Sequence, residues 1–165
     1  MTIADEDLGE VRLTGDTVEI VFRRRYGKPV EKVWAAITIP ERIADWFAET
    51  EIDGEAIRFL FPDVDYRING RIVAHTPLRT FAWTWPNDDG SASVVRFDLE
   101  PDGDGCRLTL TQSGLVAKDG ASAAGGWHAH LAGLPDAVEA RRTPWATVMA
   151  REAPLGPVYK ARVPV

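Results

Sequence analysis

Several groups on which other protein classes depend are scarce in this sequence. Its 165 residues include one cysteine, Cys106, so the chain has neither an internal disulfide nor a cysteine-based zinc or iron–sulfur site. No stretch reaches the roughly 18 consecutive apolar residues of a membrane-spanning helix. The first ten residues carry four acidic side chains and no apolar run, unlike a signal or transit peptide. We therefore expect a cytoplasmic protein that crosses no membrane.

Positive charge is also in short supply. The 19 Lys and Arg residues face 25 Asp and Glu residues, which gives a formal net charge of −6 at pH 7. Binding to phosphate backbones or anionic lipids depends on clustered basic side chains, so we expect no nucleic-acid partner and no membrane partner. Residues 44–66 contain seven acids and one base, whereas residues 141–165 contain five bases and one acid. We interpret these segments as solvent-exposed surfaces of opposite sign.

Motifs for nucleotide binding and nucleophilic catalysis are absent as well. The chain has no P-loop and no dinucleotide-binding glycine pattern, so we expect no cofactor. The segment GASAA at residues 120–124 falls one residue short of the G-x-S-x-G pattern of serine hydrolases. Cys106 follows a turn at the start of a predicted strand, which favours a small structural residue over an activated thiolate.

The overall composition is that of an ordinary globular domain. Hydrophobic residues make up 45% of the chain and charged residues 27%. These values are close to the average for soluble proteins and argue against disorder, collagen and coiled coils. A chain of 165 residues corresponds to one domain, and we expect residues 1–165 to form it.

The first elements are predicted from periodicity and from two prolines. Residues 17–26 alternate apolar and polar side chains and are rich in β-branched and aromatic types, which predicts a strand. Pro29 and Pro40 each suit the first turn of a helix, and helical spacing follows both. We expect two short helices in tandem. Their inward side chains would be Val30, Val33, Trp34 and Ile37 in the first helix, and Ile43, Trp46 and Phe47 in the second.

A period of two residues then continues for about sixty residues and predicts a series of strands. The predicted strands are Glu55–Phe61, Asp65–Ala74, Arg79–Trp85, Ser93–Glu100 and Cys106–Gln112. Their short links require antiparallel neighbours. Together with the strand at 17–26 they make a six-stranded, curved antiparallel sheet.

The last third of the chain is predicted to be a loop followed by helices. Residues 113–126 are rich in Gly, Ala and Ser, which predicts a loop, and a helix is expected from about 126 to 139. Pro135 should kink this helix or end it early. A further helix is expected at 145–152, after Pro144. The apolar face of the first of these helices would carry Trp127, His130, Leu131, Leu134 and Val138.

These elements predict an α+β fold with helices on one face of one sheet. A long antiparallel sheet curls, and a helix laid across its concave face leaves space between the two layers. Six tryptophans in 165 residues indicate aromatic walls for that space. The alternative is an ordinary core in which large rings fill volume. The candidate ligand-binding residues are Phe59, Phe61, Tyr66, Phe81, Trp83, Trp85, Phe97, Trp127, His130, Leu131 and Leu134.

Four blocks of sequence together resemble one protein family. They are PVEKVWAAITIPERIADWFAE at 29–49, GRIVAHTPLRTFAWTW at 70–85, SVVRFDLEPDGDGCRLTLTQSGL at 93–115 and AGGWHAHLAGL at 124–134. In this order they are similar to the SRPBCC superfamily, and within it to the branch named after the activator of heat-shock protein 90 ATPase homologue (AHSA). The resemblance covers about residues 15–140.

The resemblance implies the helix-grip fold of START and Bet v 1-like proteins, in which a curved antiparallel sheet surrounds a C-terminal helix and often encloses a hydrophobic cavity. Some branches of the superfamily bind lipids or polyketides, and others are cyclases or dehydratases. This chain departs from the pattern in three places. Asp53-Gly54-Glu55-Ala56 replaces the usual Gly-Gly step, Pro135 interrupts the last helix, and residues 141–165 form an extension outside the matched blocks.

His128 and His130 have the spacing of a candidate metal pair only if they lie on a strand. On a helix, side chains two residues apart point about 200° apart, so the two imidazoles cannot bind one ion. Because we predict a helix here, we expect no metal site. His130 shares the apolar face and is either an interior histidine with protein partners or a polar group of the cavity.

Our leading hypothesis is a non-enzymatic binding module that holds a small apolar or amphipathic ligand between the sheet and the helix containing Trp127. One alternative is an enzyme of the polyketide cyclase or dehydratase type, in which His130 or Asp65 transfers a proton. Another alternative is a co-chaperone-like protein-interaction domain. Formation of a homodimer is left open, because no residue in the sequence indicates an interface.

Overall fold

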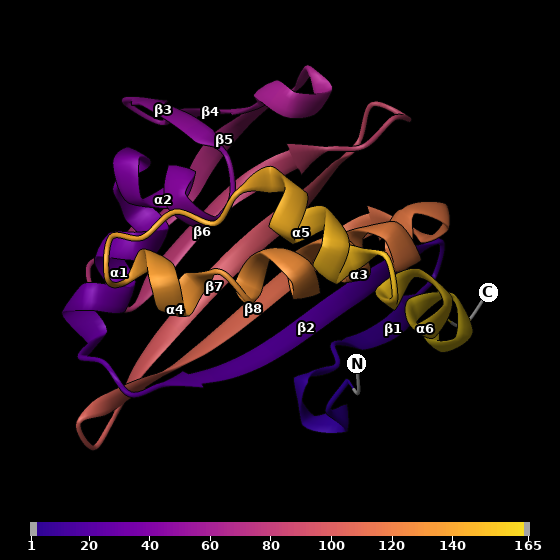
Figure 1. Ribbon diagram of the computed structural model, residues 1–165. Coiled ribbons are helices and arrows are strands. Elements are labelled where there is room, and N and C mark those ends of the chain that lie inside the picture. Colours follow the sequence, from indigo (N-terminus) through magenta and orange to yellow (C-terminus); the bar gives the residue numbers. More distant parts are fainter. Residues whose placement is uncertain (1–2, 164–165) are drawn as a thin grey trace.

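Across residues 3–163, which the computed structural model describes, eight strands form one antiparallel sheet (Figure 1). Their order in the sheet is β1-β2-β8-β7-β6-β5-β4-β3, so the chain leaves the sheet after β2 and re-enters it at the opposite edge. The strands are β1 (Glu10–Thr14), β2 (Thr17–Tyr26), β3 (Glu49–Asp53), β4 (Ala56–Phe61), β5 (Tyr66–Thr76), β6 (Thr80–Pro86), β7 (Ala92–Asp102) and β8 (Gly105–Val116).

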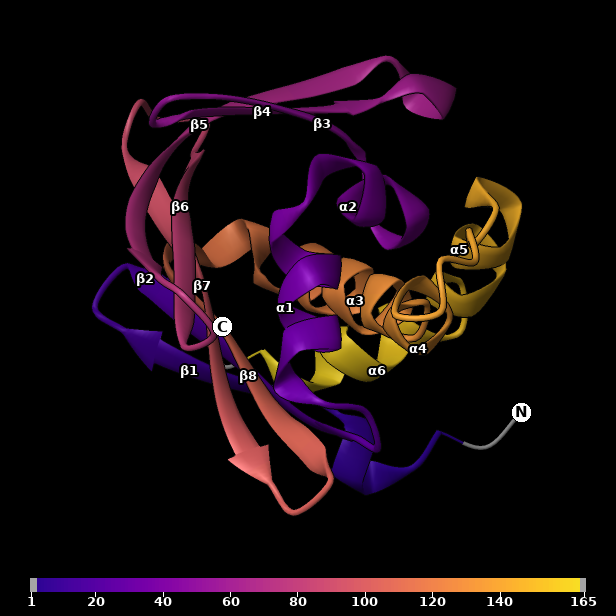
Figure 2. The same cartoon turned by 90° about the vertical axis from the view of Figure 1, so that its left-hand side faces the viewer.

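Helices cover the concave side of this sheet. Figure 2 shows the sheet curving around α1, α2 and α3, while α5 and α6 pack on α3. The helices are α1 (Val30–Thr38), α2 (Pro40–Trp46), α3 (Gly120–Leu131), α4 (Leu134–Ala137), α5 (Trp145–Glu152) and α6 (Leu155–Arg162). Short 3-10 turns occur at η1 (Asp5–Asp7), η2 (Pro62–Val64) and η3 (Ala117–Asp119). The predicted α+β arrangement is confirmed, and it is consistent with a helix grip.

The prediction of six strands is wrong, because it leaves out two short edge strands whose side chains are mostly exposed. β1 has the sequence EVRLT and β3 has the sequence ETEID, and none of their side chains is fully buried. A strand at a sheet edge pairs through its backbone on one side and does not need an apolar face. The sequence EVRLT precedes the first predicted strand, and ETEID lies in the predicted link between a helix and a strand.

The segment predicted as a loop at 113–126 is strand and helix instead. β8 extends to Val116, and α3 begins at Gly120, six residues before the predicted start near Gly126. A Cβ atom on Gly120 would lie 3.1 Å from the side chain of Val18 on β2. The small residues therefore allow α3 to approach its neighbours closely, and their abundance reflects close packing, not a flexible connection.

The helix that contains Trp127 ends early, as expected. α3 stops at Leu131, and α4 starts at Leu134 with Pro135 in its first turn, where the missing N–H needs no partner. The helix expected at 145–152 is confirmed as α5. A further helix, α6, was not predicted, because Pro154 and Pro157 indicated a break. Pro154 caps α6, and Pro157 lies within its first turn.

Candidate functional site

A pocket of about 340 Å³ lies between α3, α5, η2 and the ends of β6 and β8. We call it the aromatic pocket. Its lining residues are Phe47, Phe61, Val64, Tyr66, Trp85, Pro86, Asn87, Asp88, Gln112, Leu115, Asp119, Ser122, Ala123, Gly126, Trp127, His130, Trp145 and Glu152. A volume of this size falls within the range of small-molecule sites, and apolar walls with a few polar groups are typical of such sites.

The inner wall of the pocket is a pair of stacked rings held by a chain of hydrogen bonds. The rings of Phe47 and Trp127 lie 4.9 Å apart with an interplanar angle of 10°. Trp127 Nε1 donates to Gln112 Oε1 at 2.8 Å, and Gln112 Nε2 donates to Ser93 Oγ at 2.9 Å. Ser93 Oγ in turn donates to the Trp85 carbonyl at 3.0 Å. Because each group is fixed by the next, the wall is rigid before any ligand arrives.

His130 brings a polar atom into this apolar setting. Its Nδ1 lies 3.1 Å from the carbonyl oxygen of Trp46, and the side chain is 7% exposed. A carbonyl only accepts, so the proton is assigned to Nδ1 and the lone pair to Nε2. Burial lowers the pKa of His130 to about 4, although the hydrogen bond to Trp46 acts in the opposite direction. The ring is therefore neutral near pH 7, and its Nε2 is an acceptor that makes no hydrogen bond within residues 3–163.

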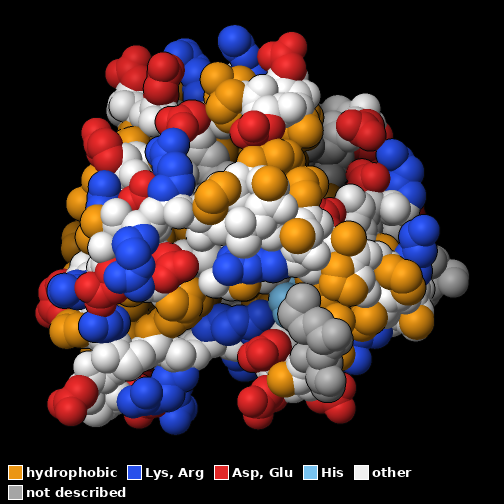
Figure 3. Space-filling model, in the orientation of Figure 1, with side chains coloured by type: hydrophobic (Ala, Val, Ile, Leu, Met, Phe, Trp, Pro, Cys, Tyr) orange, Lys and Arg blue, Asp and Glu red, His pale blue; other side chains and the backbone are white. Residues whose placement is uncertain are grey.

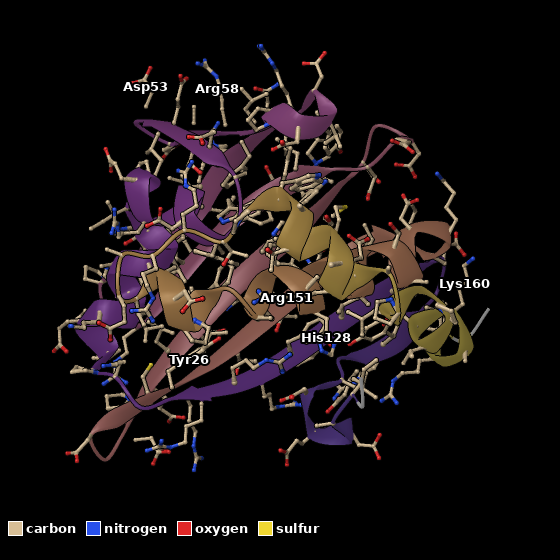
Figure 4. The ribbon with its side chains drawn as sticks, in the orientation of Figure 1. Tyr26, Asp53, Arg58, His128, Arg151 and Lys160 are labelled. Carbon is tan, nitrogen blue, oxygen red and sulfur yellow. The ribbon has the colours of Figure 1, made fainter. Side chains whose placement is uncertain are left out.

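His128 faces the opposite way, as the helical spacing predicts. It lies beside β2 (Figure 4), and its Nδ1 is 2.7 Å from Tyr159 Oη on α6. Its ring meets Phe22 edge-on at 6.0 Å. The two histidines therefore share no ligand. In the part of the chain that the structure describes, no group of three or more His, Cys, Asp or Glu side chains is placed to hold a metal ion.

Carboxylates are the charged side chains that line the aromatic pocket. Asp88 and Asp119 both pair with Lys118, at 3.1 and 3.5 Å. Glu152 forms no ion pair within residues 3–163, and burial raises the pKa of its carboxyl group. Figure 3 shows acidic and basic side chains intermixed over much of this face of the molecule, with hydrophobic side chains gathered over α5 and α6.

A second, smaller cavity of about 180 Å³ lies against the same wall. It is bordered by α2, η2 and the segment 142–145. Four side chains line both spaces: Phe47, Phe61, His130 and Trp145. These four side chains border both cavities, and we call them the partition.

Comparison with known proteins identifies the family of this site. Residues 28–139 match the family described as "Activator of Hsp90 ATPase homolog 1-like protein" (AHSA1). The chain belongs to the AHSA1 family. The resemblance deduced from the four sequence blocks is thereby confirmed. A comparison with curated proteins gave no match.

Solved structures share the fold of this AHSA1-family chain. CalU16 from Micromonospora echinospora is 26% identical, with a TM-score of 0.73 over 94% of this chain and 95% of CalU16. The protein encoded by gene BPP1335 from Bordetella parapertussis is 27% identical, with a TM-score of 0.72 over 94% of this chain and 91% of that one. MLL2253 from Mesorhizobium loti is 25% identical, with a TM-score of 0.62 over 81% and 97%. α5 lies beyond the residues that match the family, yet it contributes Trp145 and Glu152 to the pocket.

The structure divides the candidate ligand-binding residues into two groups. One group lines the aromatic pocket: Phe61, Tyr66, Trp85, Trp127 and His130. The other group is buried in the core and does not border the pocket: Phe59, Phe81, Trp83, Phe97, Leu131 and Leu134. Asp65, the second candidate for proton transfer, is exposed next to η2 and lies outside the lining.

Sequence reasoning missed several lining residues. Phe47 was expected to face inward, but nothing in the sequence connects it with Trp127. Trp145 directly follows Pro144 in the extension. An aromatic side chain at the start of a predicted helix was the one signal that could have included Trp145 among the candidates. Asn87, Asp88 and Glu152 carry no signal, because their placement depends on how a hairpin end and α5 pack.

A larger depression of about 740 Å³ lies on the outer face of the sheet and is lined by several arginines. It is an open surface whose charges are largely neutralised. Arg25 and Arg107 both pair with Asp102, and Arg23 pairs with Glu10. The aromatic pocket is lined by stacked rings and by Asn87, whose buried Oδ1 has no partner within residues 3–163, so we take it as the candidate site. Among the described residues, no helix is long and apolar enough to cross a membrane.

Proposed function

We propose that this protein is a binding module for a small apolar or amphipathic molecule, which it holds in the aromatic pocket. The observation that carries the proposal is the pocket itself. It is a space of about 340 Å³ with stacked rings at its wall and two acceptors that make no hydrogen bond within residues 3–163, Asn87 Oδ1 and His130 Nε2. Rigid apolar walls favour ligand binding because little conformational entropy is lost when the ligand enters.

The proposal treats residues 1–165 as one cytoplasmic domain. Trp145 and Glu152 of the extension complete the pocket, so we propose that the extension is part of the binding unit. The single cysteine is free and buried, which suits a reducing compartment. The site as proposed lies within one chain and needs no second copy.

The state of His130 favours binding over catalysis. A general base works best when its pKa lies near the working pH, and a pKa of about 4 makes His130 a weak base at pH 7. Asp65, the other candidate, is exposed and outside the pocket. Neither of the two residues considered for proton transfer in the cyclase or dehydratase alternative is therefore well suited to that role. The co-chaperone alternative draws its support from the family description alone.

Native mass spectrometry of the freshly purified protein tests the proposal, because it reports bound small molecules and subunit number together. We expect a co-purified ligand, or a thermal upshift with 1-naphthylmethanol as an apolar probe. Trp85→Ala, which removes a pocket wall, should abolish the response. Trp34→Ala is the matched control, since Trp34 is also half-buried but packs against His75 and Phe81 outside the aromatic pocket. Equal responses in both variants would refute the proposal.

A further inference from the structure

The charged side chains that line the aromatic pocket have one sign. Among the described residues the lining includes three carboxylates, Asp88, Asp119 and Glu152, and no Lys or Arg. Lys118 lies next to the pocket and forms ion pairs with Asp88 and Asp119. Its single positive charge neutralises one of these two carboxylates, so one negative charge remains there and a second remains on Glu152. An anionic ligand would enter against this charge, whereas a cation would be attracted.

Two buried side chains of the lining have acceptor atoms without partners. Asn87 is 8% exposed, and its Nδ2 donates to Ser91 Oγ and to the Gly114 carbonyl, both at 2.9 Å. These two bonds orient the amide, and Oδ1 is left without a partner. His130 is 7% exposed, and its Nε2 makes no hydrogen bond within residues 3–163. A buried acceptor without a partner, such as Asn87 Oδ1, costs free energy that a ligand with N–H donors would recover.

The aromatic side chains of the pocket also favour a positively charged ligand. Trp85, Trp127 and Trp145 line the pocket together with Tyr66. The faces of such rings carry negative charge density and attract ammonium groups, most strongly at tryptophan. The indole N–H groups of Trp85 and Trp145 and the hydroxyls of Tyr66 and Ser122 can bind a neutral ligand as well, so these neutral groups alone do not select a charge.

From the carboxylates, the open acceptors and the indole faces together, we infer that the aromatic pocket selects ligands that carry a positively charged amine on an apolar or aromatic body. This inference rests on the proposed function and specifies its ligand class. The apolar body would lie against Phe47 and Trp127, and the ammonium group would lie toward Glu152 or His130 Nε2. The position of Glu152 supports this arrangement, because burial raises the pKa of an unpaired carboxylate and a bound cation would reverse that effect.

Three probes of nearly equal shape test the inference by isothermal titration calorimetry at pH 7 and low salt. They are 1-naphthylmethylamine, which is protonated, 1-naphthylmethanol, which is neutral, and 1-naphthoate, which is negative. We expect the amine to bind about three- to tenfold more tightly than the alcohol, and the carboxylate to bind most weakly. High salt should weaken binding of the amine and leave the alcohol unchanged.

Variants locate the charge effect. Glu152→Gln should weaken binding of the amine about threefold and leave the alcohol unchanged. Asp53→Asn is the matched control, because Asp53 is an exposed carboxylate on the edge strand β3, outside the pocket (Figure 4). Alcohol or carboxylate binding as tight as that of the amine, or an unchanged amine affinity in Glu152→Gln, would overturn the inference alone. If none of the three probes binds, or if Trp85→Ala changes nothing, the proposed function itself is overturned.

Discussion

The two histidines of α3 lie two residues apart and end in opposite surroundings. On the His128 side, Tyr159 Oη accepts the N–H of Gly9 at 2.8 Å and donates its own proton to His128 Nδ1 at 2.7 Å. On the His130 side, one ring nitrogen binds the Trp46 carbonyl and the other has no partner among residues 3–163. Burial lowers the pKa of both rings, so the direction of the shift does not distinguish them.

The difference lies in what covers each side of the helix. The N-terminal segment and α6 close over the His128 side, and the polar atoms there find partners. The His130 side is bordered by two cavities, one on each side of the partition. α3 therefore has a structural face, which carries His128, and a face that borders the proposed ligand site, which carries His130 and which we call the binding face. At pH 7, changes on the structural face should alter mainly stability, and changes on the binding face should alter mainly ligand binding.

The largest expected effect is on the structural face. Phe22 is fully buried on β2 and lies 6.0 Å from the ring of His128 and 6.3 Å from the ring of Tyr159. Phe22→Ala should lower the free energy of unfolding by about 3–5 kcal/mol, because it leaves a cavity in a packed region. Urea unfolding measures the loss. At a temperature where the variant is folded, the affinity for 1-naphthylmethylamine should equal that of the wild type. An affinity loss in the folded variant would contradict the separation of the two faces.

The second effect comes from His130 and depends on pH. Its pKa is about 4 in the folded protein, whereas a histidine in the unfolded chain has its ordinary pKa of 6.5. Between these values the unfolded chain binds the proton more readily, so stability is present above pH 6.5 and is lost as the pH falls toward 4. From pH 7 to pH 4.5 we expect a loss of about 2 kcal/mol from this group.

His130→Asn isolates that contribution, because asparagine can keep the hydrogen bond to the Trp46 carbonyl but does not titrate. Urea unfolding at pH 7 and pH 4.5 should show a smaller acid loss in the variant than in the wild type. His128 contributes in the same direction, since burial and the nearby Arg24 lower its pKa, so His128 stays unchanged in both proteins. Identical pH dependence in the two proteins would show that His130 does not remain neutral on folding.

Most of the fold follows from the sequence, because the buried elements carry regular patterns. β2 and α5 have the predicted bounds, and the two helices after β2 begin at Pro29 and Pro40 within one residue. The edge strands β1 and β3 were missed, since they are defined by backbone pairing and most of their side chains are exposed. The predicted start of α3 is too late, because small residues serve both in loops and at close helix contacts.

The site was less predictable than the fold. Aromatic side chains can be counted in a sequence, but their partition between core and pocket depends on tertiary packing. Trp83 and Trp85 lie two residues apart on β6, so they share one face of the strand, and their ring centroids are 5.9 Å apart. Only Trp85 borders the pocket. Glu152 and Trp145 enter the site from a helix that lies beyond the segment matched to the family. Local patterns carry no information about such contacts.

A third prediction tests the partners of His128. Tyr159→Phe removes only the hydroxyl oxygen and leaves the Gly9 N–H and His128 Nδ1 without their shared partner. We expect a loss of about 1–2 kcal/mol, because buried polar groups then lack hydrogen bonds. The measurement is urea unfolding, and Tyr66→Phe at the exposed edge of the aromatic pocket is the matched control. A loss of the same size in Tyr66→Phe would show that Tyr159 has no special structural role.

The smallest expected effect on stability is at Trp145, and it should be accompanied by a change in the size of ligand that the pocket prefers. Trp145 is half-buried and lies 6.1 Å from the rings of Phe61 and His130 in the partition. Trp145→Ala should cost about 1 kcal/mol, because the ring already borders open space. It should also join the spaces of about 340 and 180 Å³.

The readout is the affinity ratio of two amines, 9-anthracenylmethylamine and 1-naphthylmethylamine. The variant should shift this ratio toward the larger ring system by about threefold or more, because a pocket discriminates ligands by the volume it can accommodate. Trp34→Ala, which changes a half-buried tryptophan outside the partition, should leave the ratio unchanged. If Trp145→Ala instead weakens both amines equally, the ring binds the ligand directly and does not separate two cavities. The ligand site would then be the aromatic pocket alone, and Trp145 and His130 would form its inner end.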